Sequence, residues 1–123
     1  MPIQTHAKLV FRRPPHRLNC AQAVLDAYQT VTGHSVAPVA DFKPFGGGRA
    51  AGGECGALYA ACQAAPSSAA AIRAAFAART GTTLCRELDA LPCEECVALA
   101  ARLLAQLHSD VRTAPSSPTP TKP

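Results

Sequence analysis

Alanine constrains the fold of this chain more than any other residue type. It accounts for 26 of the 123 residues, whereas Leu, Ile, Val and Phe together supply 24. An alanine side chain buries little apolar area, so a core that depends on it needs backbones that pack closely, as helices do. Residues with β-branched side chains, which favour strands, are sparse. The sequence therefore predicts an all-α fold, a small bundle of four to five helices with a glycine-rich loop.

Capping residues and apolar spacing place the expected helices. Asn19 is a good N-cap, and Gly33 a good C-terminal cap, for a helix over residues 20–32. Further helices are predicted over residues 54–65 and 68–80, a short helical segment over 83–90, and a last helix from Pro92 onward.

Basic charge is concentrated at the N-terminus. Residues 1–17 carry four basic side chains and no acidic one, whereas residues 18–112 carry seven basic and eight acidic side chains. We therefore predict a basic, solvent-exposed arm over residues 1–17 and a nearly neutral, cysteine-rich helical domain over residues 18–112. Prolines crowd residues 113–123, which we expect to form a disordered tail. The neutrality of the domain argues against a nucleic acid as its partner.

No segment approaches the ~20 continuous apolar residues of a membrane-spanning helix. The best run, residues 97–107, is interrupted by Arg102 and Gln106. The N-terminus also lacks the apolar stretch of an export signal. We therefore expect a cytoplasmic protein. In a reducing compartment, six cysteines in so short a chain indicate metal binding or thiol redox chemistry more than structural disulfides.

Five of the cysteines fall at expected helix starts. Cys20 and Cys55 lie in the first turns of two helices, Cys93 and Cys96 share the first turn of the last helix, and Cys85 lies near the start of the short segment. The unpaired N–H groups and the helix dipole at these ends lower the pKa of a thiol. The thiolate that they favour is the nucleophile and the metal ligand. Repetition of this placement predicts functional cysteines.

Two observations argue against a functional role for every cysteine. Cys93 and Cys96 form a C-x-x-C motif, but Glu94 and Glu95 between them oppose thiolate formation by like-charge repulsion. Cys62 is expected to pack as a small, buried apolar residue.

Glycines cluster just before Cys55. Their spacing is not that of a nucleotide-binding motif. Glycine allows backbone N–H groups to approach a sulfur or an anion closely, so these residues are candidates for contacting a group bound at Cys55. The candidate cofactor-binding glycines are Gly46, Gly47, Gly48, Gly53 and Gly56.

The order of motifs along residues 18–108 is more specific than any single one. It runs through Asn19-Cys20-Ala21-Gln22-Ala23-Val24, Phe45-Gly46-Gly47-Gly48, Gly53-Glu54-Cys55-Gly56-Ala57-Leu58, Cys85, and Cys93 with Val97. In this order the chain resembles the family of redox-active proteins named for the pattern C-GCAxxG-C-C. One position departs from that pattern, because Ala60 stands where the family has glycine.

The resemblance implies that Cys20, Cys55, Cys85 and Cys93 form a shared redox or ligand site, with Cys96 as an additional metal ligand or a substitute. The chemistry would be electron transfer through a bound iron–sulfur cluster, or thiol/disulfide exchange with a redox protein partner. Two alternatives stay open. One is a structural zinc site made by the same thiolates. The other is a metal-free interaction module whose cysteines only pack.

Overall fold

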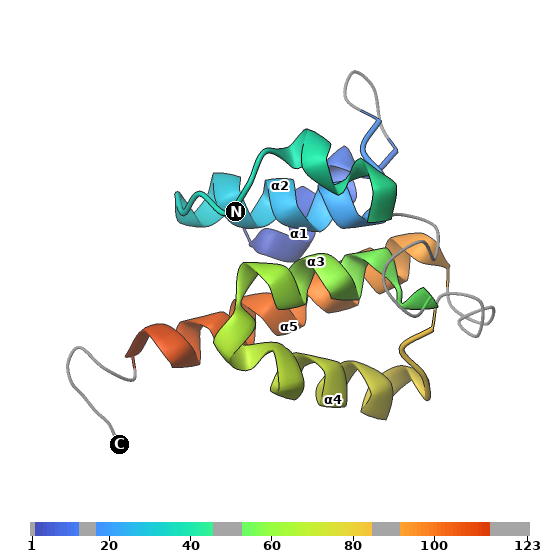
Figure 1. Ribbon diagram of the computed structural model, residues 1–123, viewed down its shortest axis with the longest axis vertical. Helices are drawn as coiled ribbons and strands as arrows, with labels where there is room; N and C mark the ends of the chain where they lie inside the picture. Colours follow the sequence, from blue (N-terminus) through green and yellow to red (C-terminus); the bar gives the residue numbers. More distant parts are fainter. Residues whose placement is uncertain (1, 13–16, 46–52, 85–91, 114–123) are drawn as a thin grey trace.

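The computed structural model describes residues 2–12, 17–45, 53–84 and 92–113, with side chains as far as Leu107. Every secondary-structure element longer than an isolated bridge in these residues is a helix, which confirms the all-α prediction (Figure 1). The elements are α1 (Ile3–Val10), α2 (Cys20–Thr32), the 3-10 helix η1 (Val39–Phe45), α3 (Gly56–Ala64), the 3-10 helix η3 (Pro66–Ser68), α4 (Ala69–Thr80) and α5 (Cys93–Thr113).

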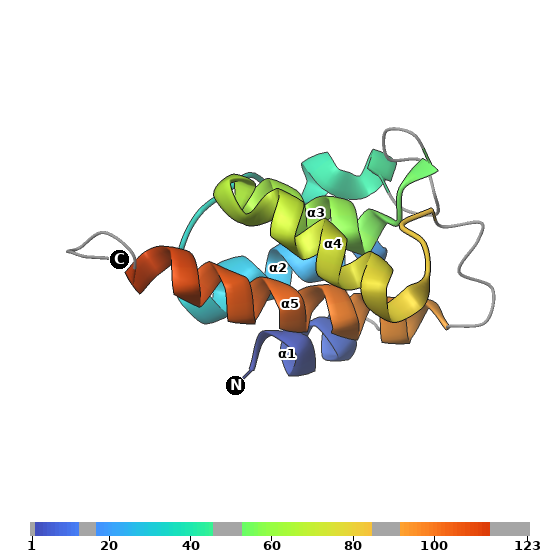
Figure 2. The same ribbon diagram turned by 90° about the horizontal axis from the view of Figure 1, so that it is seen from below.

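Helix α5 is the central element of the bundle. It contacts α1, α2, α3 and α4. Figure 2 shows it running between α1 on one side and α3 and α4 on the other. Val97, Ala100 and Leu104 on this helix are fully buried. The core of the molecule therefore forms around α5, which is packed against helices from all parts of the sequence.

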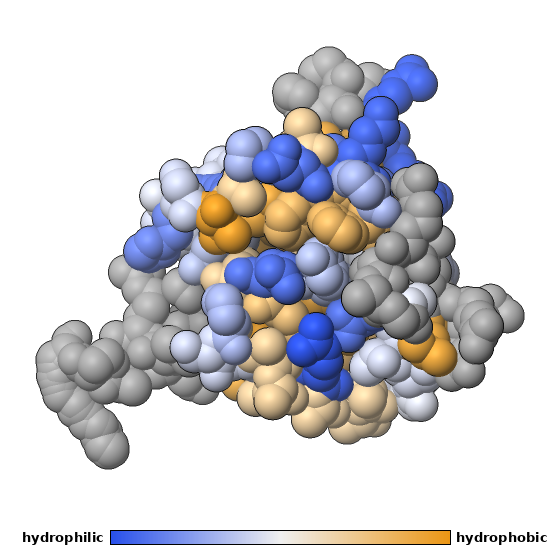
Figure 3. Space-filling model, in the orientation of Figure 1, coloured by the Kyte–Doolittle hydropathy of each residue, from blue (hydrophilic) through white to orange (hydrophobic). Residues whose placement is uncertain are grey.

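Alanines line the contacts between the helices, as the composition predicts. The fully buried alanines are Ala7, Ala21, Ala23, Ala27, Ala57, Ala60, Ala61, Ala100 and Ala101. Larger side chains, among them Leu25, Leu58 and Phe76, fill the space that alanine leaves. The outer face of α4 also carries alanines, and these are exposed along the lower edge of the molecule (Figure 3).

Helix α2 begins and ends where the sequence predicts. The side chain of Asn19 accepts a hydrogen bond from the N–H of Gln22 at 2.9 Å, and the side chain of Gln22 accepts one from the N–H of Asn19 at 3.1 Å. This capping box satisfies donors that the helix start leaves open. Gly33 ends the helix in the left-handed conformation, with φ of 77°. Asn19 also donates to the carbonyl of Lys43 at 2.9 Å, which anchors η1 beside the start of α2.

The N-terminal segment differs from the solvent-exposed arm that the sequence predicted. Residues 3–10 form α1, and Ile3, Ala7 and Phe11 are buried in the core. These three residues recur every four positions, so they share one helical face. The basic side chain of Lys8 remains partly exposed, and therefore its charge does not oppose packing. The prediction of an arm was wrong for these residues.

The other boundaries follow the prediction to within two residues. Helix α3 starts at Gly56, and α4 ends before Gly81, whose φ is 87°. The short helix expected over residues 83–90 lies mostly outside the described residues, and Leu84 instead forms an isolated antiparallel bridge with Glu54. The tail expected over residues 113–123 also lies outside them, except for Thr113 at the end of α5.

Candidate functional site

Four of the described cysteines lie at the helix starts that the sequence assigned to them. Cys20 is the first residue of α2, Cys55 is the N-cap of α3, and Cys93 begins α5 with Cys96 one turn later. Cys85 lies outside the described residues, so its position in the site stays a prediction.

Two of these cysteines meet across the bundle. Cys55 and Cys96 are 3% and 4% exposed, and the thiol of Cys96 lies near enough to that of Cys55 to raise its pKa. They come from different helices, α3 and α5, and are separated by 41 positions in the chain. No disulfide joins any of the described cysteines. The structure thus contains a buried dithiol, which we call the Cys55–Cys96 pair.

Backbone hydrogen bonds hold Cys55 in place. Its N–H donates to the carbonyl of Thr83 at 2.8 Å, and its own carbonyl accepts from the N–H of Tyr59 at 2.9 Å. The first bond ties the start of α3 to the segment after α4. On the other side of the pair, the N–H of Cys96 donates to the carbonyl of Pro92 at 3.1 Å, in the first turn of α5. Both thiols are therefore positioned by ordered backbone.

The acidity of Cys55 runs against the expectation for a helix start. The N–H groups of Leu58 and Ala57 lower its pKa, as an N-terminal helical turn should. The neighbouring thiol of Cys96 and the burial of Cys55 raise the pKa by more, and the net pKa is well above the ordinary value. Cys55 is therefore protonated at neutral pH. The prediction of a helix-start thiolate was wrong for this residue.

Cys93 has the opposite environment, since it is exposed. It lines an open cleft of about 350 Å³ together with Phe11, Arg12 and Glu94. Cys93 and Cys96 are three positions apart on α5, and residues at this spacing are neighbours on a helix surface. The C-x-x-C motif therefore links an exposed thiol to one member of the buried pair.

The remaining predicted residues contribute differently. Cys20 is partly buried and packs against the core. Gly53 adopts the left-handed conformation, with φ of 80°, and Gly56 is buried as the first residue of α3. Gly46, Gly47 and Gly48 lie outside the described residues. Contact of these glycines with a bound group therefore stays a prediction.

Cys62 packs as a buried apolar residue, as the sequence predicts. It is 2% exposed, and its Sγ donates to the carbonyl of Ala69 at 3.7 Å, where α3 faces the start of α4. Burial raises the pKa of this thiol from 9.0 to about 11. Neighbouring charges act in opposite directions, with Arg73 lowering the pKa and Glu54 raising it.

The described side chains do not form a metal site by themselves. Within residues 2–12, 17–45, 53–84 and 92–107, no three Cys, His, Asp or Glu side chains lie close enough together to hold a metal ion. Neither Cys20 nor Cys93 completes such a group with the Cys55–Cys96 pair. Tetrathiolate zinc and iron–sulfur sites need four ligands, so the described donor set does not fit either group by itself.

The sequence anticipated the members of the pair but not their pairing. The family resemblance places Cys93 in the shared site and gives Cys96 only an additional or substitute role. The apolar pattern of α5 could have indicated that Cys96 faces the core, because Cys96 lies next to Val97 and one turn before Ala100, and all three are buried. Cys93 comes one turn earlier, where α5 emerges from the core.

No helix in the described part of the chain is both long enough and apolar enough to cross a membrane. Comparison of the chain with family models, with curated proteins and with solved structures found no match.

Proposed function

We propose that this chain is a thiol redox protein in which the Cys55–Cys96 pair interconverts between dithiol and disulfide. The observation that carries the proposal is that two buried cysteines from different helices are neighbours, near enough for the thiol of Cys96 to raise the pKa of Cys55. The resemblance to the C-GCAxxG-C-C family supports the same chemistry. The partner would be a protein that carries a reducible disulfide, and the reducing environment of the cytoplasm would restore the dithiol.

Exchange would begin at Cys93, the exposed thiol of the C-x-x-C motif. Its thiolate attacks one sulfur of the partner's disulfide, so a mixed disulfide forms and the first partner sulfur leaves as a thiolate that takes up a proton. Cys96 then attacks the sulfur of Cys93. The second partner thiol leaves, and a Cys93–Cys96 disulfide remains, which is feasible because residues one helical turn apart lie within disulfide reach.

The last step would move the disulfide into the core. The thiol of Cys55 loses its proton and attacks the sulfur of Cys96, and the thiol of Cys93 is released. The net reaction transfers two electrons and two protons from Cys55 and Cys96 to the partner's disulfide. Burial supports this order, because a protonated, enclosed Cys55 reacts slowly with reagents in solution and is reached through its neighbour.

The test is a redox titration of the anaerobically purified chain with mixtures of reduced and oxidised dithiothreitol. Alkylation and peptide mapping then identify the disulfide at each ratio. We expect a Cys55–Cys96 disulfide in the wild-type chain and in Cys62→Ala, a matched control that removes a buried thiol outside the pair. Cys93→Ala should form the same disulfide much more slowly.

Two results would overturn the proposal. One is the absence of a Cys55–Cys96 disulfide at every ratio while the chain remains folded by circular dichroism. The other is stoichiometric iron with acid-labile sulfide, or stoichiometric zinc, that is lost in Cys55→Ala and kept in Cys62→Ala. That second result would assign the cysteines to a metal centre.

A further inference from the structure

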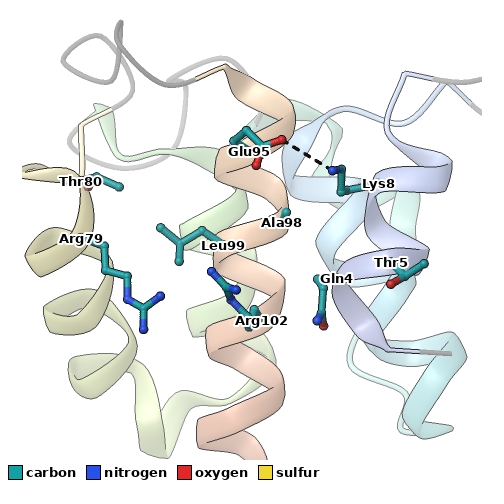
Figure 4. A pocket seen from close by; sticks show the side chains of 9 residues that line it. All are labelled: Gln4, Thr5, Lys8, Arg79, Thr80, Glu95, Ala98, Leu99 and Arg102. Carbon is teal, nitrogen blue, oxygen red and sulfur yellow. Dashed lines mark ion pairs between the residues drawn. The ribbon is translucent and has the colours of Figure 1, made fainter.

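A basic groove of about 460 Å³ lies over α5, between α1 and α4 (Figure 4). Lys8 lines it from α1, Arg79 from α4, and Glu95, Leu99 and Arg102 from α5. Helix α1 is far from α4 and α5 in the sequence, and both α1 and α4 pack against α5 because α5 is central to the bundle. None of the cysteines that the structure describes lines this groove, so it is separate from the Cys55–Cys96 pair.

The charges of the groove are unevenly compensated. Lys8 and Glu95 form an ion pair, with 3.6 Å between Nζ and Oε2. Arg79 and Arg102 have no acidic partner among the described residues, and Figure 4 shows both side chains extending into the space between α4 and α5. Two guanidinium groups in one depression repel each other, and an anion placed between them would attract both and reduce that repulsion.

The shape and floor of the groove suit a small molecule. Its volume is within the range of ~300–1,000 Å³ that is typical of small-ligand sites. Leu99 is 8% exposed and forms an apolar part of the wall. Thr80 also lines the groove beside Arg79, with its hydroxyl bonded to the carbonyls of Phe76 and Thr82. The groove thus combines two planar cationic groups, which bind phosphate or carboxylate through paired hydrogen bonds, with a hydrophobic surface.

We propose that this groove binds a small organic anion, a phosphate monoester or a carboxylate, with its charged group between Arg79 and Arg102 and its apolar part against Leu99. The binding needs no cysteine and no redox change. Failure of this proposal would therefore leave the proposed thiol chemistry unaffected, and failure of the thiol chemistry would leave this proposal unaffected.

Titration calorimetry at constant ionic strength tests the proposal, with phenyl phosphate and benzoate as probes. Benzyl alcohol serves as an uncharged comparison, and inorganic phosphate as an anion without an apolar part. We expect saturable, one-to-one binding of at least one of the two aromatic anions. Arg79→Gln and Arg102→Gln should each weaken it roughly tenfold or more, because each removes charge-assisted hydrogen bonds. Arg17→Gln, which removes an exposed arginine outside the groove, should change it less than about twofold.

Three outcomes would overturn the proposal. The first is the absence of saturable binding by both phenyl phosphate and benzoate to the folded wild-type chain. The second is an equal loss of affinity in Arg17→Gln, which would indicate general attraction to a basic protein. The third is equal affinity for inorganic phosphate and phenyl phosphate, which would contradict the role of Leu99. Circular dichroism of each variant separates a lost ligand contact from a lost fold.

Discussion

Arg73 on α4 holds the carboxylate of Glu54 through two hydrogen bonds, from Nε to Oε2 at 2.7 Å and from Nη2 to Oε1 at 3.2 Å. Glu54 directly precedes Cys55, so this ion pair fastens α4 to the start of α3 beside the buried dithiol. The carboxylate stabilises the positive charge and raises the pKa of the Arg73 guanidinium. Glu54 is only 9% exposed, and its carboxylate therefore depends on this partner for solvation.

Replacing Arg73 with methionine should destabilise the protein. The change leaves the Glu54 carboxylate buried without its counter-ion, and we expect the free energy of unfolding to fall by about 1–2 kcal/mol. This estimate lies below the cost of breaking a fully buried pair because the Arg73 side chain is 42% exposed. Urea denaturation followed by circular dichroism measures the free energy of unfolding. Arg79→Met, an exposed arginine on the same helix, is the control, and equal losses in both variants would contradict the importance of the ion pair.

The packing of α1 predicts that Phe11 is a structural residue. Phe11 is 7% exposed and lies in the core, whereas Leu9, two residues earlier, is 48% exposed. Phe11→Ala should cost about 3 kcal/mol, because it removes a buried ring and leaves a cavity. Leu9→Ala should cost less than about 0.5 kcal/mol. If the two variants unfolded at the same urea concentration, the segment would be the solvent-exposed arm that its charge suggested.

Local signals in the sequence predict those elements that local interactions determine. Asn19 and Gly33 correctly predict both ends of α2. The side chain of Asn19 accepts a hydrogen bond from an N–H group at the helix start, and the backbone of Gly33 adopts the left-handed conformation that ends the helix. Helix α1 has no such caps, and its eight residues are too few for a helix to be stable alone, so only contacts with α2 and α5 form it. The pairing of Cys55 with Cys96 has the same origin, because the register between α3 and α5 arises from packing.

Exposure predicts which described thiol reacts first. Cys93 is exposed, whereas Cys55, Cys62 and Cys96 are buried. A thiol reagent such as Ellman's reagent should therefore modify Cys93 in the native chain, and the three buried cysteines only after unfolding. The measurement is the amplitude of the fast phase at pH 8, which should fall by about one thiol per chain in Cys93→Ala. Cys62→Ala should keep the full amplitude. An unchanged fast phase in Cys93→Ala would show that the reagent does not reach the thiol of Cys93 in the native chain.

Burial of Cys62 predicts a loss of stability at alkaline pH. The folded chain raises the pKa of this thiol from 9.0 to about 11, so between these values the unfolded chain has lost a proton that the folded chain retains. The contribution is fully present below pH 9 and is lost as the pH rises through 11, by about 2 kcal/mol. Cys62→Ala should reduce the alkaline fall in the free energy of unfolding, measured in urea from pH 7 to 11. Identical slopes for the variant and the wild-type chain would mean that Cys62 ionises as freely when folded as when unfolded.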